Sequence, residues 1–282
     1  MMGLGEPCEG RACSSTSLTQ LGADPPSVLV VIAGLGHADR LRMVAQNMRR
    51  IQVMADHGSV AATCLAFVFA TELALPSSAL STIPLCQVRR QTGGLLHHLL
   101  SVPEADLVKA EFVFVMVTSV VLTADVSLRM LVRIMRANEL DWAGPACDTC
   151  KTKRTINHDY GGRFGVGRRV PMVDLQATMF RNAAFRCLQR LGNQTIEVDR
   201  FMWASLNIYR RFCSRHARFG VVDAMSIHKA SSGARVPCGW MMLDPHRISS
   251  GVRVSFSHLG PPLVLRRRDR VRQQEASCPA GG

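Results

Sequence analysis

The chain has 282 residues, a formal net charge of +13, 47% hydrophobic residues and 20% charged residues. This composition is typical of a globular protein with one large domain or two small ones. Apolar runs such as residues 28–33 and 112–117 are far shorter than the roughly 20 residues that a bilayer-spanning helix needs. A membrane-spanning helix is therefore not expected.

Arginine carries most of the positive charge, since only four of the 34 basic residues are Lys. Guanidinium groups bind phosphate in bidentate fashion, so this usage favours an anionic partner, although a solvated arginine-rich surface explains it as well. A basic run at 266–272 lies in a tail, residues 244–282, that we predict to be disordered. Nucleic-acid binding through this tail remains open.

The first 26 residues are rich in Gly, Ser, Pro and Cys, and they lack the apolar stretch of a secretory leader. They indicate a flexible tail. Several of the ten cysteines lie in apolar runs, where a reduced Cys behaves as a small hydrophobic residue. We therefore expect reduced cysteines and an intracellular protein.

Apolar periodicity in the first part of the chain predicts alternating strands and helices. Residues 28–33 are a β-branched run typical of a strand buried on both faces, and apolar residues at helical spacing follow over 39–56. The next segments are predicted in this order: strand 63–70, strand 84–88 and helix 91–101.

The alternation continues with a strand at 111–117, a helix capped by Asp125 and a strand at 142–146. Residues 147–169 indicate an exposed basic loop. The remaining predictions are strand 170–180, helices near 182–191 and 199–216, and strand 219–222. Together they predict one α/β domain, residues 27–243, with a three-layer, Rossmann-like, mostly parallel sheet flanked by helices.

A glycine-rich turn follows the first strand. Gly34 and Gly36 lack the third glycine of the dinucleotide-binding fingerprint, because His37 and Ala38 follow. A turn at the carboxyl end of a parallel strand, facing a helix N-terminus, is nevertheless where open α/β sheets bind anions and nucleotides. Turn geometry alone also explains these glycines.

Other polar residues are weaker or more ambiguous indications. Cys147 and Cys150 have the spacing of half a zinc site, but no second pair lies at a suitable distance in the sequence. Asp174 lies within the strand at 170–180, and Asp223 ends the strand at 219–222. A buried carboxylate in an apolar strand needs a bonding partner or a function, so each aspartate is either a catalytic residue or one that stabilises a helix end or a loop.

Three segments carry a resemblance to a known family. They are residues 110–147, residues 173–187 with the sequence Val-Asp-Leu-Gln at 173–176, and residues 203–228 with Val-Val-Asp at 221–223. In order and spacing they resemble a eukaryotic family of uncharacterised proteins, the domain of unknown function 707. That family is regarded as similar to glycosyltransferases with the GT-A fold.

The resemblance implies a protein that binds a nucleotide sugar and transfers the sugar to an unknown acceptor. It implies that Asp174 and Asp223 are catalytic candidates and that His228 ligates a metal or contacts phosphate. Thr118 and Ser119 stand where relatives carry the acids that hold Mn²⁺ or Mg²⁺, and neutral hydroxyls are poor ligands for these ions. A divalent metal is therefore doubtful, and transfer would be impaired or metal-independent.

The implied donor site takes its residues from the turns after the predicted strands and from the basic loop. They are Ala33, Gly34, Gly36, His37, Thr71, Glu72, Thr118, Ser119, Lys153 and Arg154. The alternative is a catalytically inactive relative, a pseudoenzyme that uses its basic surface as a binding or scaffold module for an anionic partner.

Overall fold

The computed structural model describes nine stretches of the chain, and the following account is confined to them. They are residues 24–36, 38–69, 75, 80–81, 83–149, 166–170, 173–193, 209–210 and 212–230. The predicted N-terminal tail lies almost wholly outside these residues, and the predicted C-terminal tail lies wholly outside them. So does most of the predicted helix at 199–216.

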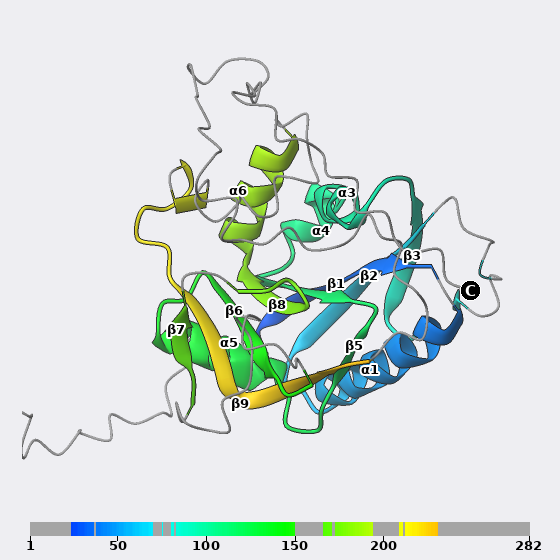
Figure 1. The fold of residues 1–282 in the computed structure, drawn as a ribbon, viewed down its shortest axis with the longest axis horizontal. Helices are drawn as coiled ribbons and strands as arrows, with labels where there is room; N and C mark the ends of the chain where they lie inside the picture. The colour runs from blue at the N-terminus through cyan, green and yellow to red at the C-terminus, as the bar shows by residue number, and fades with distance from the viewer. Residues whose placement is uncertain are drawn as a thin grey trace, which may run out of the picture.

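Within these residues, nine strands form one sheet, with helices on both of its faces (Figure 1). The strands are β1 (Ser27–Leu35), β2 (Ala61–Phe69), β3 (Cys86–Gln91), β4 (Phe112–Val117), β5 (Val120–Leu122), β6 (Trp142–Cys147), β7 (Arg168–Val170), β8 (Ala177–Arg181) and β9 (Phe219–Lys229). The helices are α1 (Ala38–Asp56), α3 (Leu95–Leu100), α4 (Glu104–Leu107), α5 (Leu128–Ala137) and α6 (Asn182–Asn193).

The strand order is β3-β2-β1-β4-β8-β6-β9-β5, and β7 also pairs with β9. Parallel pairing joins β3, β2, β1 and β4, and it also joins β6 to β9. Because β4 and β6 are both antiparallel to β8, these six strands share one direction, while β5, β7 and β8 run against them. This arrangement confirms the predicted Rossmann-like, mostly parallel α/β fold.

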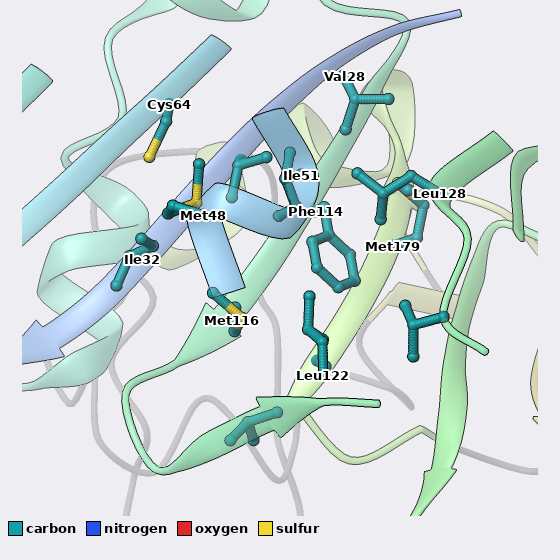
Figure 2. Packing of buried hydrophobic residues seen from close by; sticks show 14 of the residues in the cluster. Val28, Ile32, Met48, Ile51, Cys64, Phe114, Met116, Leu122, Leu128 and Met179 are labelled. Carbon is teal, nitrogen blue, oxygen red and sulfur yellow. The ribbon is translucent and has the colours of Figure 1, made fainter. Parts of the chain in front are cut away.

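Two apolar layers hold the helices against the sheet. Alternate residues of β1 point to opposite faces, so Val30 and Ile32 contact the layer under α1 and α5, whereas Val31 contacts the layer under α3, α4 and α6. Figure 2 shows the first layer, in which Met48 and Ile51 of α1 lie against the sheet. Both layers continue across the central strands, so the sheet and the helices on its two faces form one three-layer unit.

Buried polar bonds fix the position of α1. Asn47 is fully buried, donates to the carbonyl of Val120 at 2.7 Å, and accepts from the amide of Leu122 at 2.9 Å. The side chain of Asn47 thus satisfies two backbone groups of β5 that face α1. The strand β5 follows β4 directly in the chain.

Several predicted elements differ from the observed ones. The predicted strand 170–180 is two strands, β7 and β8, which pair with different neighbours. The helix predicted to be capped by Asp125 is capped by Ser127, whose side chain accepts from the amide of Met130, while Asp125 accepts from the amide of Ser226 at 2.9 Å. The strand predicted at 219–222 continues to Lys229, because the edge of β6 and the short β5 give it further partners.

The expectation of reduced cysteines is wrong for the described residues. Cys64 pairs with Cys86 across β2 and β3, Cys187 of α6 pairs with Cys213, and Cys147 is disulfide-bonded too. These are all the cysteines within the described stretches. Stable disulfides are typical of proteins that fold in oxidising compartments, so the cysteines give no support to an intracellular location. Among the described helices, none has the length and apolarity to cross a bilayer.

Candidate functional site

The carboxyl ends of β1, β4, β6 and β9 lie at one edge of the sheet, because these strands run in the same direction. The antiparallel β8 begins at that same edge. We call it the carboxyl edge; the described residues that form it are 33–36, 117–119, 148–149, 174–177 and 228–230. Ligands of open α/β sheets bind outside the carboxyl ends of strands, so the geometry of these residues decides what the protein can hold.

The turn after β1 is held by two side chains that are distant in sequence. Gly34 has a φ of +81°, a left-handed conformation that favours glycine. Its amide donates to Nδ1 of His98 at 3.1 Å, and its carbonyl accepts from Oγ1 of Thr118 at 3.2 Å. Both polar groups of this peptide position are therefore fixed, and Ala33 beside it is buried.

His98 is a further part of this site. It is fully buried on α3 and stacks on Phe67, with ring centroids 5.7 Å apart, and it also contacts Phe69. Burial lowers the pKa of His98, and the charge of His97 acts in the same direction, while a backbone interaction with Gln91 opposes them. A neutral His98 can accept the Gly34 amide, and a doubly protonated one cannot.

Thr118 and Ser119 follow β4, as the donor-site prediction requires. Thr118 is buried, and its hydroxyl donates to the carbonyl of Gly34. The carbonyl of Ser119 accepts from the amide of Ala230 at 2.9 Å. The amide of Val117 donates to the carbonyl of Gln176 at 2.9 Å. These bonds connect the ends of β1, β4 and β9 and the start of β8.

Asp174 lies at the carboxyl edge, just before β8. Its carboxylate accepts from Nε2 of Gln176 at 2.8 Å, and its carbonyl accepts from Oγ1 of Thr178 at 2.8 Å. Burial raises the pKa of Asp174, and the charge of Lys229 and the hydrogen bonds of Gln176 and Leu175 oppose that rise. The bonds of Val117 to Gln176 and of Ser119 to Ala230 place Asp174 and the end of β9 at the same end of β4.

Among the described residues of the carboxyl edge, His228 is the one with an aromatic ring, and this ring is exposed. Its Nδ1 lies 2.5 Å from Oδ1 of Asp148, and the two side chains are 48% and 31% exposed. Sequence reasoning considered Asp148 only as part of a cysteine motif. The pairing could have been found only from the register of β6 and β9, which the sequence does not reveal.

Asp223 has a different environment. Pro145 pairs with Val222 and Ala146 pairs with Ser226, so residues 223–225 bulge from β9. The carboxylate of Asp223 forms an ion pair with Arg168 of β7, and these side chains are only 1% and 11% exposed. Arg168, which lies in the predicted basic loop at 147–169, therefore neutralises a buried aspartate.

Metal ligands are sparse in this geometry. No group of three or more His, Cys, Asp or Glu side chains in the described residues is close enough to hold an ion. Asp148 and His228 provide two donors side by side, fewer than the oxygen-rich shell that Mg²⁺ requires. We therefore derive no catalytic step through a metal. Five predicted donor-site residues, His37, Thr71, Glu72, Lys153 and Arg154, lie outside the described residues.

Comparison with known proteins supports the architecture. No family model matches the sequence, and no curated protein matches it either. Among solved structures, the chain is similar to the mannosyltransferase PcManGT from Pyrobaculum calidifontis in complex with GDP-Man and Mn²⁺. The identity is 12%, the TM-score is 0.51, and the match covers 75% of this chain and 59% of the other. The chain thus has a glycosyltransferase-like fold and spans about three fifths of that enzyme.

Proposed function

We propose that this protein binds a nucleotide sugar at the carboxyl edge of its sheet and transfers the sugar to an acceptor without a conventional metal site. One observation carries the proposal: the ends of β1, β4 and β9 and the start of β8, remote in sequence, are bonded together where open α/β sheets bind ligands. The glycosyltransferase-like fold and the similar enzyme's bound GDP-Man support it. The resemblance to domain of unknown function family 707 belongs to the same proposal.

The donor would lie along the turn after β1, with its diphosphate near Thr118 and Ser119. Gly34 allows the left-handed turn that ends β1 at this edge, since another residue at this φ would be strained. The leaving diphosphate needs positive charge in place of a metal, and Lys229 lies at this edge. Lys153 and Arg154 are further candidates for that charge.

Transfer also needs a group that takes the proton of the acceptor hydroxyl. The sequence offered Asp174 and Asp223 for this task. Asp223 is buried in its ion pair with Arg168, so of the two carboxylates Asp174 is the better candidate. Its raised pKa and its position at the carboxyl edge are typical of functional carboxylates.

A thermal-shift titration tests donor binding. GDP-mannose, UDP-glucose, UDP-galactose and UDP-N-acetylglucosamine would each be added with and without Mn²⁺. We expect at least one to stabilise the protein without metal, because ligand that binds only the folded state adds to its stability. Thr118→Ala should weaken this effect, whereas Thr63→Ala, an exposed position on β2, should not. No stabilisation by any of the four would contradict the proposal.

The alternative is a relative that has lost catalysis and serves as a binding module for an anionic partner. Hydroxyl side chains at Thr118 and Ser119 and the sparse metal ligands of the described residues favour it. The double substitution T118D/S119D distinguishes the two proposals. Nucleotide-sugar hydrolysis that appears only in this double variant, and only with Mn²⁺, would support the inactive relative.

A further inference from the structure

Asp148 and His228 form a side-chain pair that the sheet itself holds together. Cys147 and Ile227 are partners in the parallel ladder of β6 and β9, so the next residues, Asp148 and His228, share one face. The amide of Asp148 donates to the carbonyl of Ile227 at 3.2 Å, and the amide of Lys229 donates to Oγ1 of Thr149 at 2.6 Å. Hydrogen bonds on both sides, one to a backbone carbonyl and one to the Thr149 hydroxyl, therefore fix the spacing of the pair.

The contact decides which nitrogen of His228 is available. A carboxylate only accepts hydrogen bonds, so Nδ1 must carry the proton that points to Asp148. In the neutral ring the lone pair is then on Nε2. A ring oriented in this way by a carboxylate is the arrangement that general-base catalysis uses. His228 is also 48% exposed, so a substrate can reach it.

The two aspartates are less accessible. The Asp223 side chain is 1% exposed and paired with Arg168, and Asp174 already accepts from Gln176 within a mostly buried position. A base must lie within hydrogen-bond reach of the proton that it abstracts, and exposure is the first condition for that. Among the candidate bases at the described carboxyl edge, His228 meets it best.

Resting on the proposed nucleotide-sugar site, we propose that His228 is the catalytic base of sugar transfer and that Asp148 is its positioning residue. The acceptor O–H bond breaks, and its proton moves to the Nε2 lone pair. The acceptor oxygen bonds to the anomeric carbon, while the bond from that carbon to the diphosphate oxygen breaks. The electron pair leaves with the nucleoside diphosphate, and the imidazolium later returns its proton to solvent.

The first test uses the ligand-free protein. Long-range ¹H–¹⁵N NMR on ¹⁵N-histidine-labelled protein, with His228 assigned through His228→Gln, reports which ring nitrogen carries the proton. We expect Nδ1–H in the native protein and exchange between both tautomers in Asp148→Ala. An Nε2–H ring, or a ring unchanged by Asp148→Ala, would overturn the inference.

The second test measures turnover, with water as the acceptor and release of nucleoside diphosphate from the nucleotide sugar that gives the largest thermal shift. His228→Gln should lower kcat by about 10²- to 10⁴-fold, the range of general-base catalysis, with an unchanged thermal shift. Asp148→Asn, which keeps an oxygen acceptor for Nδ1–H, should retain more activity than Asp148→Ala. Two matched controls at the opposite end of the sheet, His57→Gln and Glu139→Gln, should leave turnover unchanged.

Different failures have different meanings. Two results would overturn the role of His228 while donor binding still stands. One is donor binding without turnover by the native protein, and the other is turnover that His228→Gln leaves unchanged. An absence of donor binding contradicts the proposed function itself, and the catalytic role of His228 fails with it.

Discussion

The disulfide between Cys187 and Cys213 should contribute a large part of the protein's stability. It joins α6 to the segment before β9 and closes a loop with a sequence separation of 26 residues. In the chain-entropy account, cross-linking a loop of this size stabilises the folded state by about 3 kcal/mol, because it restricts the unfolded chain. The double variant Cys187→Ala/Cys213→Ala should lose this contribution, and little packing is lost with it because both sulfur-bearing residues are only partly buried.

Differential scanning calorimetry measures the effect directly. A loss of about 3 kcal/mol corresponds to a fall in Tm of about 6–12 °C for a domain of this size. The matched comparison is Cys64→Ala/Cys86→Ala, which opens a loop with a sequence separation of 22 residues and also removes a buried Cys64 side chain from the core. That variant should therefore lose at least as much.

Two outcomes would refute this reasoning. One is a Tm of the Cys187→Ala/Cys213→Ala variant within about 2 °C of the oxidised native protein, which is less than 1 kcal/mol. The other is reaction of Cys187 and Cys213 with a thiol reagent in native protein purified without reductant, which would show that the cysteines are not paired.

The remaining predictions concern buried polar groups and are measured by urea unfolding. Arg168→Met removes the cation that the buried Asp223 carboxylate pairs with, and should cost about 3–5 kcal/mol; a loss below 1 kcal/mol would contradict a tight buried pair. Asn47→Ala leaves two buried backbone groups of β5 without their side-chain partner, which should lower the free energy of unfolding by about 1–3 kcal/mol for each group. An unchanged free energy of unfolding would contradict a stabilising contact between Asn47 and β5. Asp174 has a raised pKa in the folded state, so its contribution to stability is complete below the unfolded value of 3.8 and is lost as pH rises through the folded value. Asp174→Asn should accordingly be more stable than the native protein at pH 8. Equal stability of the variant and the native protein both at pH 8 and below pH 3.8 would refute the burial argument. His98 has a lowered pKa, so the unfolded state binds its proton first and native stability should fall as pH drops below 6.5. His98→Gln should lack this loss, and a parallel decline in both proteins would assign it to other groups.

Strands buried on both faces were the most predictable part of the fold. Residues 28–33 and 112–117 are continuous apolar runs, most of them β-branched or aromatic, and they form the core of β1 and β4 as expected. Apolar spacing located α1 and α5 for the same physical reason, since each helix buries one stripe. Short edge elements such as β5 and β7 have too few residues for any period to show.

The site was less predictable, because its contacts join residues far apart in sequence. The end of β1 meets α3 through Gly34 and His98, which are 64 positions apart, and Asp148 meets His228 across 80 positions. Periodicity tells which face a residue occupies, but it does not give the order of strands in a sheet. The pairing of Asp223 with Arg168 was missed for the same reason, since the bulge in β9 has no local sequence signal.

The central claim is that the carboxyl edge holds a nucleotide sugar. Hydrogen–deuterium exchange, read by mass spectrometry with and without saturating nucleotide sugar, tests it most directly. The account predicts slower exchange in residues 33–36, 117–119 and 174–177 together, with no change at the amino ends of β1 and β2. Ligand-dependent protection confined to other parts of the chain, or no protection at all with any of the four nucleotide sugars, would contradict it.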